Sequence, residues 1–206
     1  MYTSHPSLVL GFHGCDKSVA EKIFAGKDEL IASRNPYDWL GSGIYFWEQN
    51  PERALEYATL LKNNPERSKG SQIKSPTVVG AVLDLGNCLN LLEHRSLLLV
   101  KEAYLTLKKA FRESGNELPE NSDVINDKDL LLRKLDRAVI ESLHAVRKAQ
   151  NEKTFDTVRA MFPEGDPLYS GAGFRDHSHI QICIRNPNCI KGYFRVREEN
   201  PKYPMP

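Results

Sequence analysis

The sequence lacks the cysteine spacing that marks a zinc or redox site. It has no CxxC pair and no histidine at ligand spacing beside its four scattered cysteines: Cys15, Cys88, Cys183 and Cys189. We therefore expect no bound metal. No apolar run approaches the roughly 18 residues that cross a bilayer, and the first residues lack the basic and apolar stretches of a secretory signal. The expectation is a cytoplasmic protein with reduced thiols and no membrane segment.

An excess of either charge is also missing. Lys plus Arg number 28 against 27 for Asp plus Glu, which gives a formal net charge of +1. Such a chain has no global field that attracts nucleic acid or acidic lipid. The basic segments 133–148 and 191–197 are typical of solvated faces. A few arginines and aromatic rings still suffice to hold a short single strand of nucleic acid.

What is present is enough for one globular domain. The chain has 206 residues, of which 40% are hydrophobic, so it is long enough to bury a sizeable core. Apolar periodicity and turn residues predict, in order, a strand at 8–14, a helix at 17–26, strands at 29–33 and 43–48, a helix at 51–63, a strand at 77–85, helices at 94–111 and 127–150, and a hairpin over 179–196. We predict an α+β fold, a single domain over 1–206, with a helical insertion at about 91–162.

Two features in this pattern suit ligand binding. His13 and Gly14 end the first apolar run, which places an imidazole and an unobstructed backbone at the mouth of a sheet. Tyr45 lies in a predicted strand and Tyr57 on the following helix, so folding one back on the other brings the two rings together. Two rings at stacking distance hold a flat aromatic ligand between them. Core packing of the tyrosines and a structural role for His13 remain open alternatives.

The combination resembles a known family. The sequences FHG at 12–14 and GSGIYF at 41–46, with Tyr57 one helix later, resemble the donor-binding half of the poly(ADP-ribose) polymerase family. That family has His-Gly at the end of a first strand, then Gly-x-Gly, an aliphatic residue and Tyr-Phe, then a helix with a second tyrosine. The resemblance covers residues 8–58. It implies a split β-sandwich of the ADP-ribosyltransferase type, which binds NAD in an extended cleft and transfers its ADP-ribose to an acceptor.

The resemblance also implies roles for individual residues. His13 would bond the adenosine-side ribose of NAD, and Gly14 would hold the nicotinamide carboxamide through its backbone. Tyr45 and Tyr57 would stack on the nicotinamide ring. A positively charged pyridinium between two tyrosine faces gains about 1 to 2 kcal/mol from stacking and cation–π attraction.

The loop before the tyrosine strand would follow the ligand. Gly41 and Gly43 would let this loop turn tightly against NAD. Arg34, in the approach to the loop, would touch a phosphate of NAD. NAD is therefore expected as a co-substrate, without a metal.

The family's third element is a glutamate on a late strand, and Gln181 in SHIQICIRN takes that place. An amide hydrogen-bonds a ribose hydroxyl, but it carries no charge and removes no proton at neutral pH. This departure favours transfer of a single ADP-ribose over polymer synthesis. Glu48, His177 and His179 are alternatives for assisting the acceptor, which the loop 168–178 would approach. An error in the strand register, with Gln181 merely solvated, stays open.

The resemblance therefore implies a mono-ADP-ribosyltransferase that modifies a protein or a single-stranded nucleic acid. A small member without other domains is similar to toxins of toxin–antitoxin or phage-defence systems, whose partners include a cognate antitoxin. Two alternatives use the same cleft. One is a glycohydrolase that cleaves NAD without an acceptor, and the other is an inactive module that keeps the NAD cleft for recognition. The helical insertion either contacts the acceptor or a partner protein, or covers the sheet.

Overall fold

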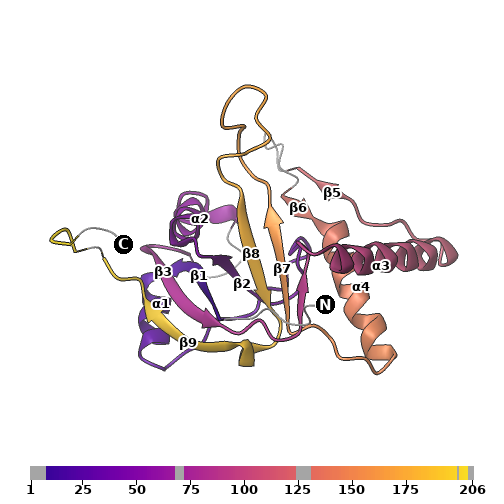
Figure 1. Ribbon diagram of the computed structural model, residues 1–206, viewed down its shortest axis with the longest axis horizontal. Coiled ribbons are helices and arrows are strands. Elements are labelled where there is room, and N and C mark those ends of the chain that lie inside the picture. Colours follow the sequence, from indigo (N-terminus) through magenta and orange to yellow (C-terminus); the bar gives the residue numbers. More distant parts are fainter. Residues whose placement is uncertain (1–7, 68–71, 124–130, 199, 204–206) are drawn as a thin grey trace.

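The computed structural model describes residues 8–67, 72–123, 131–198 and 200–203. Within these residues the fold is α+β. Four α-helices flank a mixed sheet of seven strands in the order β4-β7-β8-β2-β1-β3-β9 (Figure 1). None of the described helices is both long enough and apolar enough to cross a bilayer.

The first half of the chain follows its local sequence signals. It contains β1 (Val9–Asp16), α1 (Lys17–Phe24), β2 (Ile44–Glu48), α2 (Pro51–Asn63), the short 3-10 helix η1 (Pro65–Arg67) and β3 (Pro76–Leu83). Asp16 caps α1 by accepting a hydrogen bond from the Ser18 N–H at 2.9 Å. Asn50 caps α2 through the Arg53 N–H, and Pro51 occupies its first turn. The predicted starts of both helices are confirmed.

The second half adds helices at one end of the sheet and four more of its strands. It contains β4 (Cys88–Asn90), α3 (His94–Glu113), β5 (Asn121–Ser122), β6 (Leu132–Arg133), α4 (Lys134–Ala149), β7 (Thr157–Phe162), β8 (His179–Ile184), the 3-10 helix η2 (Pro187–Cys189) and β9 (Ile190–Arg195). Strands β5 and β6 form a separate two-stranded sheet. The predicted helix at 127–150 overlaps α4, and its first residues, 127–130, lie outside the described part of the chain.

The strand predicted at 29–33 is wrong. This segment forms a loop whose one bridge to a strand-like neighbour joins Ser33 to Gly43. Leu30 is 8% exposed and packs into the core, whereas Ile31 is 87% exposed. This alternation of buried and exposed residues resembles that of a strand. However, both edges of β2 are already paired, with β1 and with β8, so the segment 29–33 cannot pair along β2.

The hairpin predicted over 179–196 is also wrong. β8 pairs with β7 and β2, and β9 pairs with β3 at the far edge of the sheet. The turn at 186–189 therefore carries the chain across one end of the sheet instead of folding β9 back on β8 (Figure 1). Both edges of β8 are occupied by other strands, and local turn chemistry contains no information on that competition.

The helical insertion ends earlier than predicted. α4 ends at Ala149, and residues 157–162 form β7, which pairs with β8 along its whole length. The sequence of β7, TVRAMF, is buried on both faces except at Met161. Because such a strand shows no alternation of apolar and polar residues, periodicity does not distinguish it from the end of a helix.

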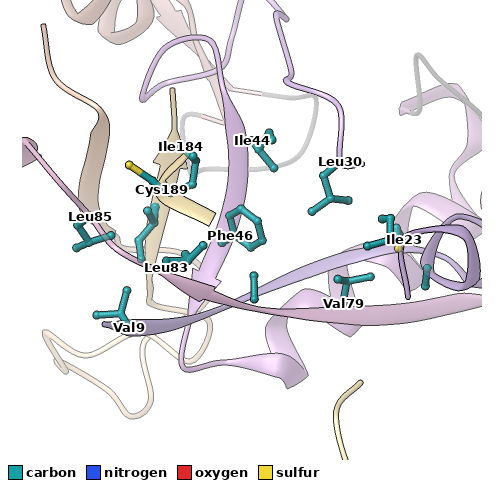
Figure 2. Close-up of a cluster of buried hydrophobic side chains, with 14 residues drawn as sticks. Val9, Ile23, Leu30, Ile44, Phe46, Val79, Leu83, Leu85, Ile184 and Cys189 are labelled. Carbon is teal, nitrogen blue, oxygen red and sulfur yellow. The ribbon is translucent and has the colours of Figure 1, made fainter. Parts of the chain in front are cut away.

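The core lies on both faces of the sheet. On one face, Ile44 and Phe46 of β2 pack with Ile23 of α1 and the strands around them (Figure 2). On the other face, Tyr45 packs with a cluster that includes Leu143 of α4. Successive residues of β2 therefore point to opposite faces. This assigns the side chains of Tyr45 and Trp47 to the face that α2, α3 and α4 cover.

Candidate functional site

Within the seven-stranded sheet, β1 and β2 share very few paired residues. β1 pairs with β3 along eight residues, but with β2 at only two positions, Gly11↔Glu48 and Phe12↔Trp47. Beyond Phe12 the two strands separate, so His13 to Asp16 and Ile44 to Phe46 face each other without a β-ladder. We call this opening the split.

His13 bridges the two strands at the start of the split. Its Nδ1 lies 2.8 Å from the backbone oxygen of Tyr45. Because a carbonyl oxygen only accepts, Nδ1 carries the hydrogen. Burial lowers the pKa of His13 below its ordinary value, and the bond to Tyr45 offsets only part of this effect. The ring is therefore neutral near pH 7, and its Nε2 is a hydrogen-bond acceptor.

The backbone N–H of Gly14 points into the split. The Gln49 N–H donates to the Leu10 C=O at 3.0 Å, so the polar groups of Leu10 face β2. Backbone groups alternate sides along a strand, so those of Gly14, four residues on, face β2 as well. Their partner in the ladder would be Tyr45, whose carbonyl instead accepts from His13. Within the described residues, the Gly14 N–H is left without a β-ladder partner.

Tyr45 is held by the loop that precedes it. Its hydroxyl donates to the Gly41 C=O at 2.8 Å and accepts from the Leu40 N–H at 3.1 Å. Burial raises the pKa of Tyr45 well above its ordinary value, so the phenol stays protonated. The ring is partly buried against the cluster under α4.

Tyr57 lies on α2, close to β2 and to the connection between β7 and β8. It is 41% exposed on α2, and its ring lies 5.1 Å from that of Trp47, two residues beyond Tyr45 on the same face of β2. Burial, Tyr37 and the carboxylates of Asp38 and Glu164 raise the pKa of Tyr57 to about 12. No ring contact joins Tyr45 to Tyr57 in the described chain. That both rings stack on one ligand stays a prediction.

Gln181 lies beside this face, on β8. It is paired in register with Trp47, and its Oε1 accepts a hydrogen bond from the Trp39 Nε1–H at 2.7 Å. A chain of aromatic contacts surrounds it, with centroid separations from 5.1 to 6.0 Å: Trp39 to Phe162, Phe162 to His179, His179 to Trp47, and Trp47 to Tyr57. Gln181 therefore belongs to an aromatic wall that runs from Trp39 to Tyr57.

The residues expected to compensate for Gln181 are placed differently. Glu48 points to the opposite face of β2 and pairs with Arg159, whose Nη2 lies 2.8 Å from its Oε1. His179 is in the aromatic wall, where burial lowers its pKa to about 4. Its Nδ1–H donates to the His177 C=O at 2.8 Å, and its buried Nε2 has no partner among the described residues. His177 is exposed beside Asp176.

Arg34 and Gly43 line a separate hollow of about 670 Å³ next to α4. A Cβ on Gly43 would lie 2.5 Å from the Cys183 sulfur, so packing against β8 already requires glycine there. Gly41 has a φ of +85°, which fits the expected tight turn. A Cβ on Gly41 would lie 2.6 Å from an Arg185 nitrogen, so packing and backbone conformation account for both loop glycines without a ligand.

The glycine loop is fastened to α4. The Glu141 carboxylate accepts the Ser42 N–H at 2.6 Å and both terminal nitrogens of Arg185, at 3.0 and 3.1 Å. Arg137 donates to the Ser42 hydroxyl at 3.2 Å. Burial raises the pKa of Glu141, but the bonds from Arg185 and Ser42 outweigh it and lower the pKa to about 2. α4 therefore fixes the loop that positions Tyr45. This part of the helical insertion does more than cover the sheet.

Replacing Glu141 with glutamine is expected to cost about 1.5 to 3 kcal/mol at pH 7, the range for hydrogen bonds to charged groups. The wild-type advantage depends on the carboxylate. Since the folded pKa of about 2 lies below the ordinary 4.5, this advantage is complete above pH 4.5 and is lost as the pH falls toward 2. Thermal unfolding of both proteins between pH 7 and 2 measures it. A gap in Tm that stays constant over this range would contradict the assignment.

Sequence patterns did not reveal two residues at this site. Trp39 bonds Gln181 from a loop 142 positions away in sequence. Glu164 lies on the β7–β8 connection. There it accepts a hydrogen bond from the Arg53 guanidinium at 2.9 Å, and its charge helps to raise the pKa of Tyr57. Trp39 stands next to the glycine motif, which is a weak signal. No local signal marks Glu164, since a single glutamate in a loop is ordinary. In the described residues no group of three His, Cys, Asp or Glu is arranged to hold a metal.

The comparisons with known proteins add little to this geometry. No family model matches the chain. An uncharacterized protein of Methanocaldococcus jannaschii is 26% identical over 200 residues, which cover 87% of this chain and 83% of that protein. No solved structure matches. The chain is thus similar to an archaeal protein over nearly its full length.

Proposed function

We propose that this chain is a mono-ADP-ribosyltransferase that binds NAD at the split and transfers ADP-ribose to a protein or single-stranded nucleic acid. The proposed fold is that of the ADP-ribosyltransferases, with β1 and β2 as the two strands that part around NAD. The observation that carries the proposal is the Gly14 N–H, which lies beside the His13–Tyr45 bond and has no β-ladder partner on β2 among the described residues. The N–H donates to the nicotinamide carboxamide oxygen, and the His13 Nε2 accepts from a ribose hydroxyl.

The electrostatics around Tyr57 support a cationic ring there. The negative charges of Asp38 and Glu164 both raise the pKa of the Tyr57 phenol. Their negative field, together with the aromatic faces of Tyr57 and Trp47, stabilises the pyridinium of bound NAD. As the glycosidic bond breaks, positive charge develops on the ribose, and the same carboxylates stabilise it. In this proposal the two carboxylates supply part of the charge that Gln181 lacks, and since Glu164 is already paired with Arg53 at 2.9 Å, the larger part comes from Asp38.

Gln181 limits the chemistry. Its amide positions the nicotinamide ribose but accepts no proton from an incoming nucleophile. We therefore propose a single transfer, without chain extension. The same feature keeps open a module that binds NAD without cleaving it. The other alternative use of the site is a glycohydrolase, in which water takes the place of the acceptor.

Incubating the protein with NAD that is radiolabelled in the adenylate phosphate, with and without a cell lysate, separates these functions. Nicotinamide release together with label on lysate protein or nucleic acid supports the transferase. Nicotinamide release without label on macromolecules indicates the glycohydrolase. NAD binding without nicotinamide release indicates the module, and absence of binding contradicts all three.

The biological setting comes from the family resemblance alone. We propose a cytoplasmic effector of a toxin–antitoxin or phage-defence system, with a cognate antitoxin as partner. Arrest of bacterial growth on induced expression tests this role separately from the chemistry.

A further inference from the structure

The hydrogen bond between Trp39 and Gln181 has one chemically allowed orientation. An indole N–H donates and does not accept. The Gln181 atom 2.7 Å from the Trp39 Nε1 is therefore the amide oxygen, and the amide NH2 group points away from Trp39. Trp39 thus determines which end of the amide is available to a ligand.

The Trp39 indole is itself fixed in place. Its ring makes an edge contact with Phe162 at 5.1 Å. The guanidinium of Arg133, at the start of α4, lies 5.0 Å from the Trp39 ring and 4.1 Å from the Phe162 ring. One cation–π contact and one ring contact hold the Trp39 ring, and a second cation–π contact joins Arg133 to Phe162. A fixed donor keeps the Gln181 amide from flipping between its two orientations.

The NH2 group of Gln181 is free to bind. In the described residues its one protein hydrogen bond is the one to Trp39, made through the oxygen. The Gln181 side chain is only partly buried, so its nitrogen is not enclosed in the core. Gln181 is paired with Trp47, against which Tyr57 packs. The available hydrogens therefore lie on the face of the sheet that carries Trp47 and Tyr57, where the nicotinamide ring is proposed to bind.

We propose that Trp39 is a positioning residue, which locks Gln181 so that its NH2 group donates to the nicotinamide ribose. This proposal rests on the proposed function and adds to it the direction of one hydrogen bond. At this place the site donates a hydrogen bond, so the ribose oxygen is the acceptor. Trp39 itself touches no substrate.

A double-mutant cycle tests this coupling. In wild type, Trp39→Phe keeps an aromatic ring and removes the N–H, and is expected to lower kcat for nicotinamide release about tenfold with KM changed less than about twofold. In a Gln181→Ala background, the same substitution is expected to change kcat less than about twofold, because there is no amide left to orient. Equal effects in both backgrounds would overturn the proposal. Thermal unfolding of each variant identifies a loss that comes from misfolding.

Nuclear magnetic resonance tests the bond without any activity. The chain has two tryptophans, Trp39 and Trp47, and the buried Trp47 Nε1 has no hydrogen-bond partner within the part of the chain that the structure describes. In Gln181→Ala, the indole N–H resonance assigned to Trp39 is expected to move upfield and exchange about tenfold faster. An unchanged Trp39 resonance would refute the bond even if NAD is cleaved. A shifted resonance with no turnover in wild type would refute the proposed function and leave the bond established.

Discussion

Replacing His13 with alanine is expected to lower the rate of nicotinamide release at least about tenfold, since a lost hydrogen bond of about 1.4 kcal/mol in the transition state costs that factor. The side chain has two tasks. Its Nδ1–H holds the Tyr45 carbonyl at 2.8 Å, which keeps that carbonyl from the Gly14 N–H. Its Nε2 is the acceptor offered to NAD. Steady-state kinetics of nicotinamide release measure the combined loss.

Two conservative variants separate these tasks. The amide nitrogen of asparagine occupies about the position of Nδ1, so His13→Asn keeps the bond to Tyr45 and lacks the acceptor. It is expected to unfold at nearly the wild-type temperature and to bind NAD more weakly. His13→Gln, whose amide oxygen can take the place of Nε2 as the acceptor, is expected to lose the Tyr45 bond and to keep the acceptor. If His13→Asn releases nicotinamide at the wild-type rate, His13 has a structural role only.

The parts of the fold that sequence predicted are those fixed by neighbouring residues. Asp16 and Asn50 cap their helices through N–H groups two and three positions away, and such signals are readable from the chain itself. The wrong predictions concern partners. β9 joins β3 and not β8 because β8 already has two neighbours. Which edges of a sheet are free depends on the whole topology, and no local pattern records it.

The candidate site divides in the same way. The His-Gly and Gly-x-Gly motifs indicated β1 and β2, and the structure brings these two strands together around His13 and Tyr45. The motifs gave only a weak sign of Trp39, which stands beside the glycines, because its importance depends on a contact with a residue 142 positions away. They also assigned Gly14 to the ligand alone. The structure adds a second demand on that glycine.

α2 passes extremely close to Gly14. A Cβ at this position would lie 2.0 Å from the backbone oxygen of Ala54 and 3.1 Å from the Ala58 Cβ. Real carbon and oxygen atoms do not approach so closely, and a backbone carbonyl within a helix cannot rotate away. Any side chain at Gly14 therefore displaces α2, which carries Tyr57. Close packing of the helix on β1 and access to the split both depend on this one glycine.

Gly14→Ala is accordingly expected to destabilise the fold by about 3 kcal/mol, the upper part of the range for overpacking, which lowers Tm by roughly 6 to 12 °C in a protein of this size. Gly192→Ala is the matched control. It also lies in a strand of the same sheet, and a Cβ there meets nothing within 4 Å, so its Tm should stay within about 2 °C of wild type. Differential scanning calorimetry of both variants decides the matter. Equal Tm values would mean that α2 lies farther from β1 than the structure places it, and the position of Tyr57 beside the split would then lose its support.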